Sequence, residues 1–220
     1  MILKDLISKN KILSDLFKNI PDKTLNHNVN GISGNSKNIK NDYIFVAIKG
    51  AQFDGSDFIN EARQNGAFLI IADKSEDKTV ISTNKISTRL VYTELLASFY
   101  YKQPKEIIGV TGTNGKTSTV EFCRQLWVQT GWKAASMGTL GTNIENTLNK
   151  SFLKSSRQNL TTFEPDQLYK ELNNYTKTIP HYRCSVKEWK WRNGWLWKRE
   201  QGMLHRQFLG ETIKKYENKF

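Results

Sequence analysis

The stretch Thr111-Gly112-Thr113-Asn114-Gly115-Lys116-Thr117 stands between two segments of different character. Residues 106–110 form a short apolar run typical of a buried strand, and residues 117–129 have the pattern of a helix that stops at Gly131. A glycine-rich turn between a strand and a helix gathers main-chain N–H groups at the positive end of the helix dipole. The stretch therefore predicts a cradle for the phosphates of a nucleotide such as ATP.

The side chains of this loop have separate expected roles. Lys116 brings a positive charge to the β- and γ-phosphates, so we predict it as the catalytic residue. The Thr117 hydroxyl is placed to bind Mg²⁺. The spacing departs from the strict G-x-x-x-x-G-K-[ST] form, because five residues separate Gly109 from Gly115. The predicted nucleotide-binding residues are Gly112, Thr113, Asn114, Gly115, Lys116, Thr117 and Ser118.

The segments before the loop predict a smaller α/β region with a polar stretch at residues 26–41. Apolar residues at helical intervals indicate helices, and short β-branched or aromatic runs indicate buried strands. The expected helices cover residues 2–20 (one or two helices), 57–64 and 87–103, with Ser87 as the cap of the third, and the expected strands cover 43–48, 67–72 and 79–81.

Pro104 is the predicted domain boundary. A strand at 106–110, the loop, a helix at 117–129 and a strand at 133–137 follow it, and this βαβ order implies a mostly parallel sheet covered by helices. Residues 146–159 are polar and predict a loop, after which Glu164-Pro165 opens a helix through Leu172. The expected fold class is α/β, with a small N-terminal domain followed by a partial phosphate-loop domain.

Composition narrows the class of protein. The chain has 220 residues, 38% hydrophobic and 11% aromatic, which is enough for packed cores and excludes wholesale disorder. The formal net charge is +12, but residues 178–220 hold ten Lys/Arg and four Asp/Glu, so half of the excess lies there. The remaining charge suits nucleotide phosphates as well as nucleic acid.

Targeting signals and cysteine usage indicate a cytosolic protein. Cys123 and Cys184 have neither the density of a disulfide framework nor the spacing of a metal site, which favours a reducing compartment. The N-terminus interrupts its apolar residues with charges, unlike a signal peptide. No apolar stretch approaches the length of about 20 residues that a membrane span needs.

The variant Thr-Gly-Thr-Asn-Gly-Lys-Thr resembles the ATP loop of the Mur ligases and of folylpolyglutamate synthetases. The first family fits better, in its branch that adds the third residue of the peptidoglycan stem peptide, because a folate ligase lacks the preceding uridine-binding domain. The resemblance covers roughly residues 30 to 175. The matching stretches are Asn35-Ser36-Lys37, Asp42 to Gly50, Asp54-Gly55, Gly66-Ala67, Met137-Gly138-Thr139-Leu140-Gly141 and Leu160-Thr161-Thr162.

The resemblance implies a UDP-sugar-binding domain at 1–103 and a partial ATP-binding domain at 104–177. It implies ATP-dependent amide formation through an acyl phosphate, adding diaminopimelate or lysine to a UDP-N-acetylmuramoyl dipeptide, in a monomer without membrane partners. The implied substrate-binding residues are Ser36, Gln52, Thr161 and Thr162. Asn35 and Lys37 replace the Asp and Arg that flank this serine in the family, and Ala51 stands where a His is often found.

From Thr178 the sequence changes texture. Four tryptophans, at 189, 191, 195 and 197, lie among basic residues without an apolar period. One hypothesis is a basic, Trp-rich nucleic-acid-binding protein. The preferred hypothesis is out-of-frame translation. Glu188-Trp189-Lys190-Trp191, written with A-ending Glu and Lys codons, reads Met-Glu-Met from the third base of the Glu188 codon, which is similar to the Mur ligases there.

That hypothesis makes residues 178–220 an aberrant tail that packs poorly. The Glu-Val-Ser-Ser-His-Gly-like segment of the family, its carbamylated lysine and its amine-binding domain have no counterpart in the sequence. The chain is therefore expected to be an inactive fragment of a ligase.

Overall fold

The computed structural model describes residues 1–50, 53–83, 86–104, 106–110, 114–138, 141–144, 164–178 and 183–187. They fall into two compact units, Met1–Tyr101 and a second that begins at Lys102. The boundary expected from the sequence lies between residues 103 and 104. Each unit has its own sheet, and each is described by itself below.

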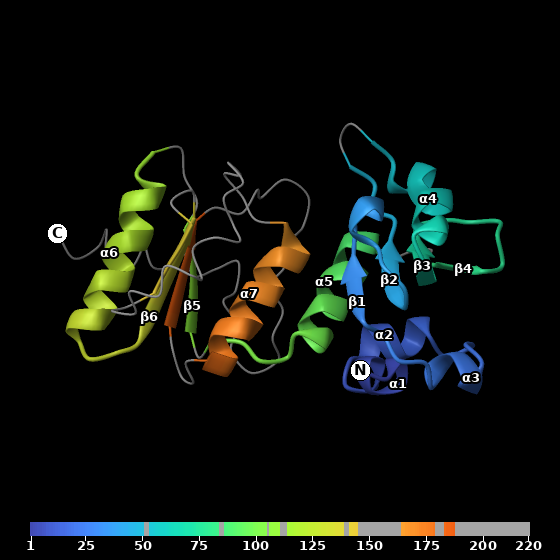
Figure 1. Cartoon of the computed structure of the whole chain (residues 1–220), viewed down its shortest axis with the longest axis horizontal. Coiled ribbons are helices and arrows are strands. Elements are labelled where there is room, and N and C mark those ends of the chain that lie inside the picture. Colours follow the sequence, from blue (N-terminus) through green and yellow to red (C-terminus); the bar gives the residue numbers. More distant parts are fainter. Residues whose placement is uncertain are drawn as a thin grey trace, which may run out of the picture. The chain divides into compact units, whose positions relative to one another are not determined.

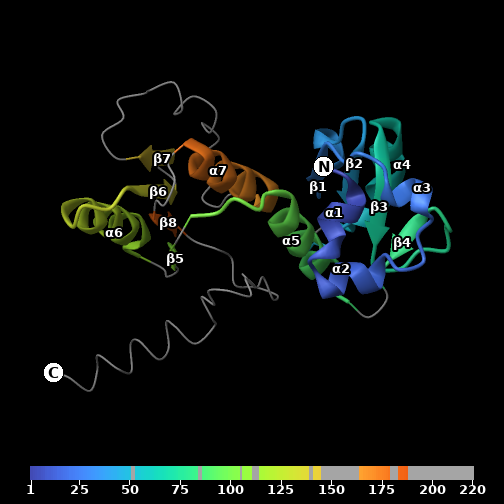
Figure 2. The same ribbon diagram turned by 90° about the horizontal axis from the view of Figure 1, so that it is seen from below.

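The first unit contains a parallel sheet whose strands follow one another in chain order (Figure 1). Helices cover both of its faces, with α5 on the face opposite α4 (Figures 1 and 2). The strands are β1 (Gly31–Ser33), β2 (Tyr43–Val46), β3 (Ala67–Ala72) and β4 (Val80–Ser82). The helices are α1 (Leu3–Ser8), α2 (Lys11–Leu16), α3 (Asp22–Leu25), α4 (Ile59–Gln64) and α5 (Thr88–Phe99), with 3-10 turns η1 (Ser36–Asn38) and η2 (Gly55–Phe58).

The core of this unit follows from the alternation of side chains along its strands. Phe45 and Ile70 belong to the apolar cluster that includes Ala62 of α4. Their neighbours Ile44 and Ile71, which point to the opposite face, are also fully buried. Both faces of the sheet are therefore buried from solvent, as is usual for a parallel sheet.

The second unit contains four strands in the order β5-β8-β6-β7. The strand β8 pairs in parallel with both of its neighbours, whereas β7 pairs antiparallel with β6. Two helices lie on opposite faces of this sheet (Figures 1 and 2). The elements are β5 (Glu106–Val110), α6 (Lys116–Gln129), β6 (Ala134–Gly138), β7 (Gly141–Ile144), α7 (Pro165–Thr178) and β8 (Arg183–Lys187).

The predicted α/β class and mostly parallel sheet are confirmed, and three strands were missed. The sequence reading placed β1 inside a polar stretch, gave no strand at β7, and assigned β8 to a poorly packing tail. That last expectation is wrong for Arg183–Lys187, because these residues form an interior strand that is hydrogen-bonded on both sides. Ser87 does precede α5, but its side chain makes no capping hydrogen bond.

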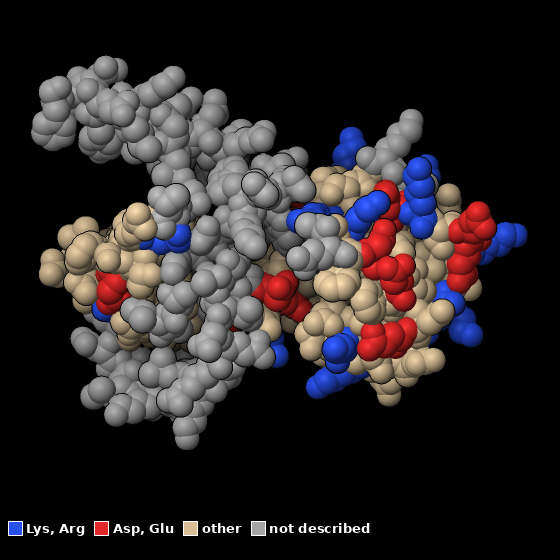
Figure 3. Space-filling view, turned by 90° about the horizontal axis from the view of Figure 1, so that it is seen from above, with Lys and Arg blue, Asp and Glu red and all other residues tan. Residues whose placement is uncertain are grey.

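Charges of both signs are mixed over the face of the first unit shown in Figure 3. That view gives no support to a single-sign surface for nucleic acid. The tryptophans at 189–197, on which that hypothesis depends, lie outside the described residues. Among the helices of the described ranges, none combines the length and the apolar character needed to cross a membrane.

Candidate functional site

The predicted phosphate loop joins β5 to α6, the strand-to-helix context that the motif requires. Gly115 precedes the helix with a φ of 76°, and no atom of the described residues lies within 4 Å of where a Cβ would stand. The left-handed backbone is therefore the reason for a glycine that the described part of the chain supports. Of the seven predicted residues, Asn114 to Ser118 lie together at the start of α6. Gly112 and Thr113 lie outside the described residues.

The first turn of α6 contains Lys116 and Thr117, the two residues with predicted chemical roles. Lys116 and Thr117 are both half-buried, and Asn114 and Ser118 are exposed. The Thr119 hydroxyl and amide both donate to the Gly115 carbonyl, at 3.0 and 2.9 Å, which closes the first turn. The N-terminal amides of this helix point back toward the loop, as anion binding requires.

The described residues contain no group of three His, Cys, Asp or Glu side chains able to hold a metal ion. A cage built from protein ligands alone is therefore not available within them. Mg²⁺ bound beside a nucleotide keeps several waters and takes phosphate oxygens, so that it needs few protein ligands. The Thr117 hydroxyl fits that role as a hard oxygen donor at the start of α6.

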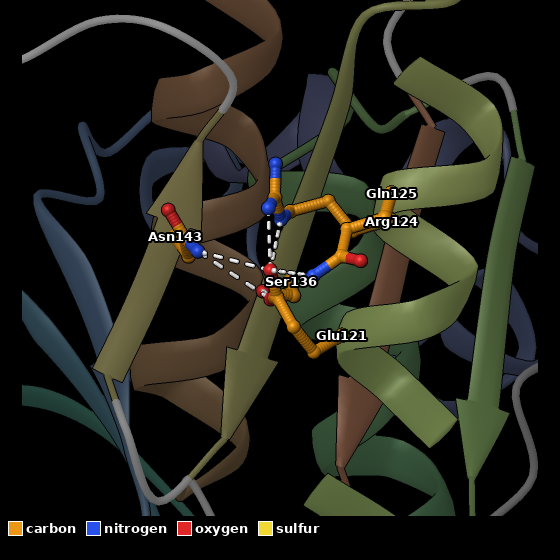
Figure 4. Close-up of polar contacts among 5 residues, drawn as sticks. All are labelled: Glu121, Arg124, Gln125, Ser136 and Asn143. Carbon is orange, nitrogen blue, oxygen red and sulfur yellow. Dashed lines mark hydrogen bonds and ion pairs between the residues drawn. The ribbon is translucent and has the colours of Figure 1, made fainter. Parts of the chain in front are cut away.

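A polar network attaches α6 to the sheet, and Glu121 is its centre (Figure 4). The Ser136 hydroxyl of β6 donates to Glu121 Oε2 at 2.9 Å, and Asn143 Nδ2 of β7 lies 3.3 Å from Oε1. Arg124 Nε donates to Oε1 at 2.9 Å, Arg124 Nη2 makes a second bond, and Gln125 Nε2 lies at 3.3 Å. One carboxylate thus binds groups from three elements.

These donors stabilise the ionised form of Glu121. The hydrogen bond from Arg124 is the main cause, and those from Ser136 and Gln125 act with it against the opposing effect of burial, so that the pKa of Glu121 falls to about 2. The sequence reading missed this residue. The spacing of Glu121 to Arg124 and Gln125 on a predicted helix was the available signal.

Ser36, the predicted substrate contact, lies in η1 just after β1. This is the carboxyl edge of the parallel sheet, where open α/β sheets bind their ligands. Its side chain is turned inward: the hydroxyl donates to Glu61 Oε2 at 2.5 Å, and the residue is 5% exposed. Its carbonyl accepts from Asn65 Nδ2 at 3.0 Å. Gln52, Thr161 and Thr162 lie outside the described residues.

Comparison with known proteins gives a consistent result for both units. The Mur ligase family, catalytic domain, matches residues 28–97, and the Mur ligase middle domain matches residues 110–182. The chain belongs to the Mur ligase family. The two matched ranges contain Ser36 and the phosphate loop, and β8 begins directly after the second range.

Two curated relatives of this Mur ligase chain carry the same function in their names. The UDP-N-acetylmuramoyl-L-alanyl-D-glutamate--2,6-diaminopimelate ligase 2 of Clostridium acetobutylicum is 40% identical over 127 residues, covering 56% of this chain and 26% of the relative. The corresponding ligase of Rickettsia conorii is 44% identical over 126 residues, with the same two coverages. The chain thus spans about a quarter of the length of these relatives.

A solved structure agrees with the Mur ligase fold. A UDP-N-acetylmuramoyl-L-alanyl-D-glutamate--2,6-diaminopimelate ligase matches with a TM-score of 0.58 and 22% identity, over 80% of this chain and 35% of that one. At this identity the match supports the fold alone.

Other polar groups of the Mur ligase chain have structural roles. His27 is half-buried, with its ring stacked on Phe68 at 3.6 Å and its Nε2 2.8 Å from Asp42 Oδ1. The carboxylate of Asp54 accepts from the Ser56 amide at 3.0 Å and caps η2. This bond is the main reason why the pKa of Asp54 lies below its usual value.

Proposed function

We propose that this chain supplies the nucleotide-binding and UDP-sugar-binding parts of an ATP-dependent amide ligase. The reaction would add diaminopimelate to UDP-N-acetylmuramoyl-L-alanyl-D-glutamate, the activity printed in the names of both relatives. The observation that carries the nucleotide half of the proposal is the turn at Gly115, which places Lys116 and Thr117 at the N-terminus of α6. ATP and UDP-linked precursors are cytoplasmic metabolites, which is where we place the reaction.

The chain's own residues would act on the phosphate tail in two ways. The amides at the start of α6 and the Lys116 ammonium neutralise and orient the β- and γ-phosphates, so that the terminal phosphoryl group is presented to a substrate carboxylate. Thr117 would hold Mg²⁺ together with phosphate oxygens and water. When bound, Mg²⁺ supplies further charge neutralisation.

The first unit would hold the UDP-muramoyl dipeptide at the carboxyl edge of its sheet, through Ser36 and Gln52. Thr161 and Thr162 would contact the peptide end of the substrate. Because the Ser36 hydroxyl already donates to Glu61, its contact with substrate requires the oxygen to act as an acceptor, or the hydroxyl to rotate away from Glu61.

Isothermal titration of the chain with ATP and Mg²⁺ tests the proposal. Lys116→Ala should weaken ATP binding roughly tenfold to a hundredfold, the cost of losing hydrogen bonds from a charged donor. Lys133→Ala, an exposed lysine beyond the other end of α6, is the matched control and should bind as the wild type does. The proposal fails if the wild-type chain binds no ATP or if both variants lose the same affinity.

A further inference from the structure

The helix that carries the phosphate site is thinly attached by apolar contacts. Of the side chains of α6, Val120 alone is fully buried. Two large apolar residues of the same helix, Phe122 and Leu126, are 62% and 61% exposed. The half-buried side chains of α6 include Cys123, Trp127 and Val128. Apolar contacts are not directional, so these side chains define the rotation and sliding of the helix on the sheet less sharply than hydrogen bonds do.

The Glu121 network has the directional character that Val120 lacks. Ser136 is 6% exposed and lies between Ala135 and Met137, which pack against α7 on the opposite face. The alternation of side chains along β6 therefore turns the Ser136 hydroxyl toward α6, where it meets Glu121 Oε2. Asn143 reaches the same carboxylate from β7. Bonds from two strands to one ionised acceptor constrain the helix along more than one direction.

The anchored strands lie next to the proposed site in the topology of the sheet. Because β5 and β6 both run parallel to β8, their carboxyl ends lie at one edge, where the phosphate loop and the β6–β7 turn begin. Lys116 and Glu121 share α6 and are about 7.5 Å apart along its axis, at 1.5 Å per residue. A shift of Glu121 against β6 is therefore passed on to the first turn.

We propose that Glu121 is a positioning residue for the nucleotide phosphates. It sets where the first turn of α6, with Lys116 and Thr117, stands relative to the β6–β7 hairpin. This inference rests on the proposed binding of a nucleotide at that turn. Glu121 itself is committed to Arg124, Gln125, Ser136 and Asn143, so it acts through the helix and not by touching the phosphates.

The test compares Glu121→Gln with Asp77→Asn, each titrated with ATP and separately with ADP. Asp77 pairs with Arg63 in the first unit, so its variant makes the same change from carboxylate to amide in the unit that does not carry the phosphate loop. We expect Glu121→Gln to weaken ATP binding about tenfold, the equivalent of one hydrogen bond to a charged group. Asp77→Asn should bind as the wild type does.

The ratio of ATP to ADP affinity separates positioning from stability. A lower folded fraction weakens both nucleotides by one factor, whereas a displaced Lys116 loses the contribution of the γ-phosphate. We therefore expect the ratio to fall about threefold in Glu121→Gln. An unchanged ratio would overturn the inference while leaving nucleotide binding intact, and a wild-type chain that binds neither nucleotide would overturn the proposed function instead.

A second variant keeps the test decisive if Glu121→Gln does not fold. Ser136→Ala leaves the carboxylate in place and removes its bond to β6, so the ratio should move in the same direction by a smaller factor. Ser136→Thr keeps a hydroxyl and should restore the ratio. If Ser136→Ala binds ATP and ADP with the wild-type ratio, the anchoring of α6 to β6 does not position the phosphates.

Discussion

The helices α5 and α6 each cover one face of a sheet, yet they are held by different forces. In α5, seven of twelve residues are buried, including Val91, Leu95 and Leu96. In α6, which has fourteen residues, Val120 is the one buried residue, and the ionised Glu121 adds hydrogen bonds to two strands. A helix held mainly by apolar area tolerates small shifts in polar contacts, whereas a helix with little buried area is more sensitive to them. The helix beside the proposed phosphate site is closer to the second kind.

The two units also differ in the order in which their strands pair. Those of the first unit pair in chain order, so each finds its partner in the next segment. In the second unit, β8 enters last and separates β5 from β6. The second sheet therefore depends on a pairing between distant segments.

The strongest way to break this comparison is Val186→Pro in β8. Proline removes an N–H from a strand that is paired on both sides, next to Gly109 and Met137, and should cost about 3 kcal/mol or more. Hydrogen exchange followed by mass spectrometry should show the second unit losing protection while the first keeps it. Unchanged protection of β5 and β6 would mean that residues 183–187 do not hold this sheet together.

A matched pair of leucines sharpens the contrast between the two helices. Leu95→Ala in α5 removes a fully buried side chain and should lower the free energy of unfolding of the first unit by about 3 kcal/mol. Leu126→Ala in α6 removes a side chain that is 61% exposed and should change stability by less than about 0.5 kcal/mol. Thermal unfolding followed by circular dichroism compares them. Equal losses would show that α6 is packed as α5 is.

The pH dependence of the second unit tests the electrostatic half of the comparison. The pKa of Glu121 is lowered from 4.5 to about 2, so its stabilising contribution is complete above pH 4.5 and is lost as the pH falls from 4.5 through 2. Because a quarter of the side chain is exposed, we discount this contribution for solvent screening to about 1 kcal/mol. Denaturant unfolding at pH 3 and pH 6 should show part of this loss in the wild type, because pH 3 lies between the two pKa values, and none of it in Glu121→Gln. An equal change in the free energy of unfolding between pH 6 and pH 3 in the two proteins would contradict this prediction.

The last prediction concerns Ser36 in the first unit. Ser36→Ala removes a hydrogen bond to Glu61 and should destabilise the first unit by about 1 kcal/mol. If Ser36 also contacts the substrate, titration with the UDP-muramoyl dipeptide should show weaker binding under conditions where the variant is fully folded. Unchanged affinity with reduced stability would assign Ser36 a structural role alone.

The sequence predicted those strands and turns whose pattern lies within one short segment of the chain. Apolar runs identified β2, β3, β5 and β6, and glycine spacing located the turn before α6. Strand β1 was missed because Gly31-Ile32-Ser33 contains one large apolar residue, and its burial depends on pairing with β2. Strand β8 was missed because the surrounding residues are rich in Lys and Arg and show no apolar alternation. Its main chain nevertheless pairs with both β5 and β6.

The candidate site likewise contains residues that a local motif predicts and residues that only the folded structure brings together. Lys116 and Thr117 follow from a motif seven residues long, which needs no knowledge of the sheet. The contacts of Glu121 with Ser136 and Asn143 span 15 and 22 residues and depend on the register of β6 and β7 against α6. No pattern within one segment contains that register. The assignment of residues 178–220 to a shifted reading frame stays a prediction, and sequencing the gene around those codons tests it.

The late entry of β8 also has a consequence for synthesis on the ribosome. The first unit is complete once Tyr101 has emerged, so it can fold while the remainder is still being made. In the second unit the hairpin of β6 and β7 can close early, but β5 must wait for Lys187 before its partner strand is available. During that interval the unpaired main-chain groups of β5 face solvent or a chaperone. We expect the nascent second unit to be the aggregation-sensitive half of the polypeptide.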